Sequence, residues 1–258
     1  AAVATVIGQI IAAILALVFN LKCNRELNIS MKGFRPNGHL IVQIYKVGAP
    51  SIVVQAIGSL MTYGMNLILA AFGSAQTVFG IYFKLQSFVF MPVFGLNNGM
   101  VPIIAYNYGA GHKDRVIKTI KHSVAYGVGI MFVGLLAMHI FPAQLMRMFD
   151  AEESLIAIGA PALETISLSF VFAGFCIVAG SVFQALGNGV YSMIVSVARQ
   201  MCVLLPVAKL LSLSGEVTLI WWAFPIAELA SVLLTSYFLV RIYRKVICHI
   251  GEPVVQDA

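Results

Sequence analysis

Four ionisable side chains lie inside long apolar stretches of the sequence, where a charge is costly unless it meets a partner or water. They are Lys84, Glu164, Arg199 and Glu228. At 1.5 Å per helical residue, Arg199 lies about 14 Å from one end of its stretch and Glu228 about 15 Å from the opposite end of its own. In a membrane core about 30 Å thick both would lie near mid-depth, so we expect them to be partners.

Two roles remain open for this pair. It is either a structural ion pair that locks two helices together, or a site for proton relay or substrate binding. The same estimate places Lys84 and Glu164 about 10 Å from the outer ends of their stretches, which makes them a second candidate pair. Glu164 has one further alternative, which is that it lies near the interface and is solvated.

A second set of candidates lies in the stretch FMPVFGLNNGMVPIIAYNYGAGHKDRVIK, from Phe90 to Lys118. A proline inside a helix frees the carbonyl four residues earlier, so Pro102 frees that of Asn98. Gly95 and Gly99 have the G-x-x-x-G spacing that lets helices approach closely. One helical face would carry Met91, Gly95, Asn98, Gly99, Pro102 and Tyr106.

We expect this face to act as a cavity wall or a hinge, although Pro and Gly are also common in membrane helices for other reasons. The hinge candidates are Pro92, Gly95, Gly99 and Pro102. The candidates for lining a cavity or binding substrate are Met91, Asn98 and Tyr106 from this face, and Gln55 and Asn66 from the preceding apolar stretch.

No catalytic or metal-binding pattern accompanies these residues in the sequence. The four cysteines, Cys23, Cys176, Cys202 and Cys248, have neither C-x-x-C nor zinc spacing. There is no phosphate-binding loop, nucleophile elbow or H-E-x-x-H motif. The sequence therefore predicts no enzyme, no resident cofactor or metal, and no nucleic-acid partner.

The elements that hold these residues are predicted to be membrane helices. The chain is 60% hydrophobic and 10% charged, whereas a soluble domain is usually about 25% charged. Long apolar runs predict an all-α polytopic membrane protein with about seven spans. These are expected near residues 1–21, 47–71, 77–106, 118–141, 157–184, 190–211 and 218–245.

Basic residues predict the orientation of these spans. Twelve of the 16 Lys and Arg residues fall in the segments 22–46, 107–121 and 241–245. All three segments lie on the same side if seven spans alternate, and the positive-inside rule makes that side cytoplasmic. Acidic residues, among them Asp150, Glu152, Glu153 and Glu216, gather on the opposite side.

One connection is much longer than the others. Residues 22–46 contain the breakers Gly33, Pro36 and Gly38, and end in LIVQIYK, which we expect to be a short interfacial segment. This connection separates the first span from a group of six at 47–245, followed by a tail at 246–258. Because the chain begins within an apolar run, we expect it to be part of a longer polypeptide.

Several stretches resemble one family of transporters. Four stretches are similar to the C-terminal lobe of multidrug and toxic compound extrusion (MATE) transporters, closest to the MepA-like branch. They are GAPSIVVQAIGS at 48–59, the stretch from Phe90 to Lys118, VFQALGNGVYSMIVSVARQMCVLLP at 182–206 and WWAFPIAEL at 221–229. The resemblance covers residues 40–245. It implies that 1–21 is the last helix of the N-terminal lobe, 22–46 the cytoplasmic interlobe linker, and 47–245 a six-helix lobe.

The resemblance also implies a function. It is export of drugs and other amphiphilic, often cationic compounds by alternating access, in exchange for protons or sodium ions, across the cell (inner) membrane, with the basic loops and C-terminus cytoplasmic. The implied partners are the bilayer, small amphiphilic molecules and the N-terminal lobe of the same polypeptide. Some sodium-coupled members carry carboxylates where this sequence has Gln55 or Gly58, and Ala173, which argues against a sodium site of that kind here.

Two alternatives remain from the sequence. A flippase for lipid-linked substrates in the same superfamily would require a large basic cavity. A heptahelical protein, either a receptor or a retinal protein, would also have seven spans. A receptor would carry a D-R-Y-like triplet after the third span, where this sequence has NYGAGHKDRV. A retinal protein would need a lysine in the last span, and residues 218–240 contain none.

Overall fold

The computed structural model describes residues 2–23 and 37–251, and every regular element in these ranges is a helix. The chain divides into two compact units, Ala1–Ile44 and Tyr45–Ala258. The first contains α1 (Ala2–Cys23), an apolar helix with a mean hydropathy of 2.2. Residues 24–36, the central part of the expected linker, lie outside the described residues.

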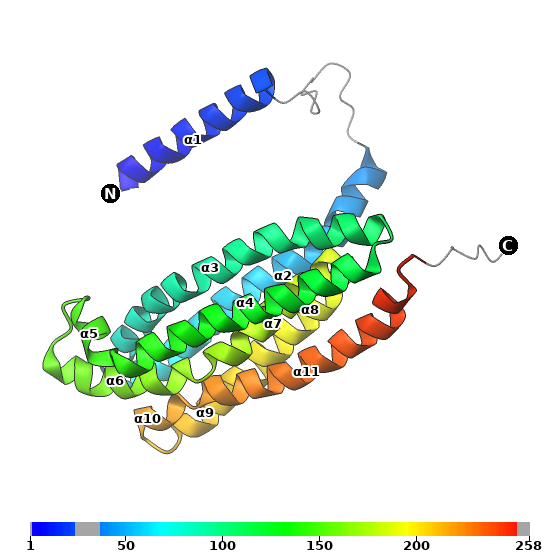
Figure 1. Ribbon diagram of the computed structural model, residues 1–258. Helices are drawn as coiled ribbons and strands as arrows, with labels where there is room; N and C mark the ends of the chain where they lie inside the picture. The colour runs from blue at the N-terminus through cyan, green and yellow to red at the C-terminus, as the bar shows by residue number, and fades with distance from the viewer. Residues whose placement is uncertain (1, 24–36, 252–258) are drawn as a thin grey trace. The chain divides into compact units, whose positions relative to one another are not determined.

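The second unit contains the remaining helices, of which α3, α4, α7 and α11 run side by side (Figure 1). The elements in chain order are α2 (Gly38–Leu69, which begins in the first unit), a 3₁₀ turn (Ala70–Phe72), α3 (Ala75–Gly109), α4 (Lys113–Ile140), α5 (Pro142–Arg147), α6 (Glu153–Ser167), α7 (Phe170–Ala185), α8 (Gly189–Val197), a π-helical segment (Ala198–Leu204), α9 (Leu205–Ser212), α10 (Val217–Ile220), α11 (Ala223–Lys245) and a 3₁₀ turn (Ile247–His249).

The helices confirm an all-α polytopic membrane protein. Six segments of the described chain are long and apolar enough to span a membrane, and a bent pair, α6 with α7, makes a seventh. The ends of the six agree with the predicted spans to within five residues. The largest shift is at the basic loop expected at 107–121, because α4 already begins at Lys113.

Two predicted spans contain breaks that the sequence analysis did not place. The fifth bends by 48° between α6 and α7, where the Ser169 hydroxyl donates to the Ile166 carbonyl at 2.6 Å. The last is interrupted between α10 and α11 at Trp221 and Trp222. LIVQIYK, which we expect to be a short interfacial segment, lies in the first turns of α2.

Glycines allow the central helices to approach closely. A Cβ at Gly127 on α4 would lie 2.7 Å from Val178 on α7, and one at Gly174 on α7 would lie 3.0 Å from the carbonyl oxygen of Gly127. A Cβ at Gly134 would lie 2.1 Å from a methyl group of Val89 on α3. Small residues at such crossings are typical of membrane helix pairs, because lipid tails give apolar side chains no net drive to associate.

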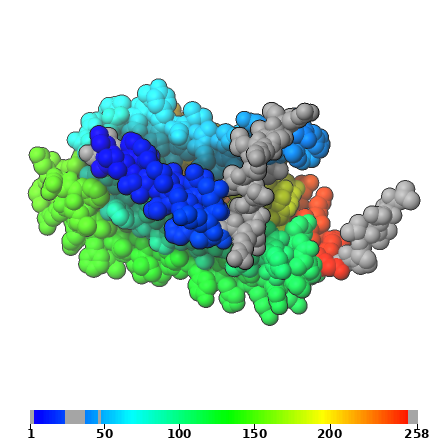
Figure 2. Space-filling view, turned by 90° about the horizontal axis from the view of Figure 1, so that it is seen from above, coloured from blue at the N-terminus to red at the C-terminus, as the bar shows by residue number. Residues whose placement is uncertain are grey.

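α2 packs more loosely than these helices. From residue 45 onward its buried side chains are Ile57, Met65 and Leu69, and Gly64 meets the Leu205 side chain. In the space-filling view, the cyan residues of α2 and the green residues of α4 to α6 lie at opposite edges of the second unit (Figure 2). One face of α2 lines a cavity within this unit.

Candidate functional site

A cavity of about 880 Å³ lies within the second unit, lined by α2, α3, α7, α8, the π-helical segment and α11. This volume is in the range of small-molecule sites. The wall combines aromatic side chains with hydroxyl and amide groups. The aromatic residues are Tyr82, Phe83, Phe90, Phe94, Phe183 and Phe224.

The polar part of the wall comes from stripes at helical spacing. Glu228, Ser231 and Thr235 recur every three or four residues along α11 and so share one face. α7 contributes a stripe of Cys176, Gly180 and Gln184 in the same way. The Gln184 amide donates to the Ser192 hydroxyl of α8 at 3.2 Å, which ties two of the lining helices together.

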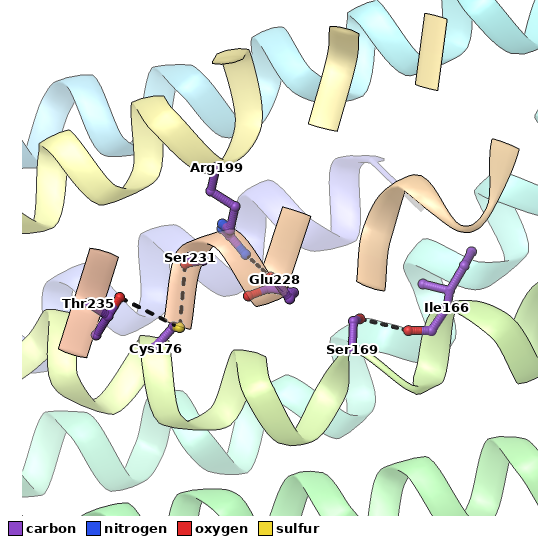
Figure 3. Close-up of polar contacts among 7 residues, drawn as sticks. All are labelled: Ile166, Ser169, Cys176, Arg199, Glu228, Ser231 and Thr235. Carbon is purple, nitrogen blue, oxygen red and sulfur yellow. Dashed lines mark hydrogen bonds and ion pairs between the residues drawn. The ribbon is translucent and has the colours of Figure 1, made fainter. Parts of the chain in front are cut away.

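Arg199 and Glu228 are the only charged residues that line the cavity within the described chain. Arg199 Nη1 donates to Glu228 Oε1, as Figure 3 shows. The Arg199 side chain is 28% exposed and that of Glu228 only 8%. The expectation that these two residues are partners is therefore confirmed. Arg199 is the member of the pair that is more exposed to the cavity.

The π-helical segment positions Arg199. Pro206 has no N–H to donate to the carbonyl four residues earlier, and just before it the Leu205 N–H bonds to the carbonyl of Gln200, five residues back. Such π-bulges occur often at functional sites. Here the bulge places Arg199 and Gln200 on the cavity wall.

A buried thiol lies next to the ion pair. Cys176 on α7 accepts hydrogen bonds from Ser231 at 3.4 Å and Thr235 at 3.6 Å, both from α11 (Figure 3). These contacts fix the face that α11 turns toward α7. They therefore fix the position of Glu228, which lies one helical turn before Ser231.

The structure brings some of the sequence-predicted cavity residues together. Gln55 and Asn98 line the cavity. Met91 and Tyr106 do not line it; they are 68% and 74% exposed on other faces of α3. Asn66 is also outside the lining, and its amide donates to the Thr62 carbonyl at 2.9 Å. These three side chains therefore lie outside this cavity, and a role for them in binding stays a prediction.

The hinge candidates lie within an unbroken helix. α3 continues through both Pro92 and Pro102, and only Pro102 lines the cavity. A Cβ at Gly95 or Gly99 would have no neighbour within 4 Å among the atoms described. The close approach expected from their G-x-x-x-G spacing is therefore absent from this part of the chain, and a hinge role stays a prediction.

The second predicted ion pair is not formed. Lys84 Nζ instead lies 5.6 Å from the centre of the Phe149 ring, as a cation–π contact. Glu164 is half-buried and has no ion pair within the residues that the structure describes. The other ion pair in these ranges joins Arg147 to Glu153 at 2.9 Å on the surface.

Sequence reasoning missed several lining residues. Asn97, next to the predicted Asn98, also lines the cavity and is buried, and its Oδ1 atom has no hydrogen-bond partner among the described residues. Gly58 and Ala173, which the sequence analysis considered only as positions where some members of the resembled family carry carboxylates, also line the cavity. The signal that would have found the others is the three-to-four-residue spacing of polar side chains in the last three spans.

A bundle of membrane helices around an amphiphilic cavity defines the class of a polytopic membrane protein with an internal small-molecule site. The MatE family model matches residues 50–210. The chain belongs to this family.

Named relatives support the assignment. The multidrug export protein MepA of Staphylococcus aureus (strain N315) is 27% identical over 230 residues, which cover 88% of this chain and 50% of that protein. MepA of Staphylococcus haemolyticus (strain JCSC1435) is 25% identical over 246 residues, covering 95% and 54%. This chain therefore spans about half the length of the curated relatives it matches.

Solved structures show the same fold. The MATE multidrug transporter DinF-BH is 32% identical with a TM-score of 0.82, covering 93% of this chain and 55% of that one. An outward-facing multidrug resistance MATE family transporter of the MOP superfamily is 17% identical with a TM-score of 0.85, covering 98% and 56%. These matches argue against a heptahelical receptor.

Proposed function

We propose that this chain forms the C-terminal half of a cation-coupled antiporter that exports drugs and other amphiphilic compounds by alternating access. The observation that carries the proposal is the cavity of about 880 Å³, whose wall combines aromatic residues with hydroxyl and amide groups. Such a surface accommodates flat apolar molecules that carry a few polar groups. The named relatives, MepA and DinF-BH, are multidrug transporters.

The charge of the cavity favours this function over lipid-linked substrate flipping. A diphosphate headgroup needs several basic residues, because its charge is concentrated. The described wall has one, Arg199, which is paired with Glu228. A nearly neutral wall is better suited to amphiphilic cargo.

Transport by alternating access requires two bundles that move around a shared site. We propose that the other wall of the site comes from an N-terminal lobe of the same polypeptide. The coupling ion is a proton or sodium. Glu228 is the carboxylate of this half that is best placed to respond to either ion, because it is buried on the cavity wall. The protein would lie in the cell membrane with its basic loops in the cytoplasm.

Transport by the full-length protein in liposomes tests this function. A fluorescent amphiphilic dye should be moved in a saturable manner when a proton or a sodium gradient is imposed, and the movement should stop when that gradient is collapsed. Dye movement that neither gradient changes, or that does not saturate, would contradict a cation-coupled antiporter.

A further inference from the structure

Arg199 has binding capacity that the protein itself does not use. Its guanidinium carries five N–H donors in a planar fork, and one of its nitrogens, Nη1, donates to Glu228. The described residues supply no acceptor for the nitrogens on the rest of the fork, and the side chain is 28% exposed on the cavity wall. An arginine in this state matches a carboxylate, which can accept two parallel hydrogen bonds.

Glu228 offers a ligand much less. Its side chain is 8% exposed, Oε1 is occupied by Arg199, and Oε2 is buried without a hydrogen-bond partner in the described chain. Less of this carboxylate than of the guanidinium is therefore open to a ligand. The charge that the cavity presents to a ligand is therefore positive, even though the pair as a whole is neutral.

The surroundings of Arg199 fit a carboxylate on an aromatic body. Three residues close to Arg199 in the sequence also line the cavity and supply neutral hydrogen-bonding groups: Ser192, Ser196 and Gln200. Phe224 on α11 and Phe83 on α3 line the same cavity and provide the flat apolar surface that aromatic ligands stack against.

We propose that Arg199 is a carboxylate-binding subsite of this cavity and that Glu228 is its built-in competitor. The cargo then includes amphiphiles that carry an anionic group, whether or not they also carry a positive one. Glu228 occupies part of the fork in the empty cavity. A ligand carboxylate binds on the open side of the fork and is opposed by the negative charge of Glu228. This inference rests on the proposed function, because it concerns the same cavity.

A pair of dyes that differ at one group tests the subsite. The first is a cationic xanthene dye whose carboxyl group is an ethyl ester, and the second is its zwitterionic free acid. Binding of each to the purified full-length protein in lipid nanodiscs is measured by fluorescence anisotropy. Glu228→Gln removes the competing charge but keeps an oxygen that accepts from Arg199. It should tighten binding of the free acid about tenfold or more and leave binding of the ester nearly unchanged.

The second variant removes the arginine as well. Arg199→Gln/Glu228→Gln keeps two amides of similar size, so neither residue is left as an unpaired charge. It should abolish the preference for the free acid. If this variant does not fold, Arg199→Lys/Glu228→Gln replaces it, and the preference should then fall by about tenfold from the Glu228→Gln value, because lysine cannot form the bidentate contact. Arg147→Gln/Glu153→Gln, at the exposed ion pair, is the matched control and should leave both affinities unchanged.

The outcomes separate the two proposals. If neither dye binds the wild-type full-length protein, the cavity is not a ligand site and the proposed function fails with the subsite. If both dyes bind but Glu228→Gln leaves the free acid unchanged or weakens it, the subsite is wrong and the function stands. If Glu228→Gln weakens the cationic ester in particular, the ligand-facing charge is that of Glu228, which also overturns the proposal.

Discussion

Arg199 and Glu228, which are 29 positions apart in the chain, form the ion pair that closes one wall of the cavity between the π-helical segment and α11. Glu228 is buried and Arg199 partly exposed. The pair therefore joins a structural contact to a charge that a ligand can reach, and the two roles can be tested separately.

The structural role predicts how the pair responds to mutation. Glu228→Ala should destabilise the protein by about 3–5 kcal/mol, because it leaves the arginine without its partner at membrane depth. Arg199→Gln/Glu228→Gln should cost less than this single change. Thermal unfolding in detergent measures both variants. Arg147→Gln/Glu153→Gln at the exposed pair, whose side chains are 61% and 79% exposed, should change stability by less than about 1 kcal/mol. A double variant no more stable than Glu228→Ala would argue against the pairing.

The close crossing of α3 and α4 predicts a contrast between two glycines of α4. Gly134→Ala places a methyl group 2.1 Å from Val89, and the β-branched valine has little rotamer freedom to move away. We expect a loss of about 1–3 kcal/mol from overpacking. Gly129→Ala, which meets nothing within 4 Å, should be neutral or slightly stabilising. Unfolding midpoints compare the two, and equal effects would show that the crossing is not tight.

The π-helical segment predicts an effect of Pro206. Pro206→Ala restores an N–H and allows the segment to return to α-helical bonding, which would turn the preceding residues by about 100°. Ser196, on the cavity wall, should then turn away. Maleimide labelling of Ser196→Cys, in a background that lacks the native cysteines, should fall when Pro206→Ala is added. Unchanged labelling would mean that the bulge does not depend on this proline.

The basic residues predict the orientation in the membrane. An impermeant thiol reagent added to intact cells should not label Lys113→Cys at the start of α4, and should label Glu153→Cys at the start of α6. Glu153 is the control because we expect it on the outer side of the membrane and because its side chain is 79% exposed. Ready labelling at 113 from outside would reverse the orientation.

The sequence was sufficient for the fold because the signal of a membrane span is long and strong. The seven expected spans correspond to the six apolar helices and the one bent pair. It did not predict the breaks within spans, because these depend on local competition for backbone hydrogen bonds. At the bend, Ser169 takes a carbonyl that regular helix would use. At the bulge, the missing N–H of Pro206 is compensated by π-type bonding.

The candidate site was only partly predictable. Similar depth in the membrane was enough to pair Arg199 with Glu228, because both lie near the middle of their spans. The same argument failed for Lys84 and Glu164, since depth says nothing about which faces of two helices meet. A different argument, from one helical face of α3, identified Asn98 and Pro102, which line the cavity, together with Met91 and Tyr106, which do not. Tertiary contacts decide these cases.

The most direct test of the central claim is dye binding with the cavity filled. Ser181 lines the cavity on α7, and Ser181→Trp would place an indole in it. Val133→Trp, at a position on α4 that is 65% exposed, is the control for the added bulk. Fluorescence anisotropy of an amphiphilic dye with the full-length protein in nanodiscs should show saturable binding for the wild type and for Val133→Trp, and at least about tenfold weaker binding for Ser181→Trp. Equal binding by all three proteins would contradict the claim that this cavity holds the cargo.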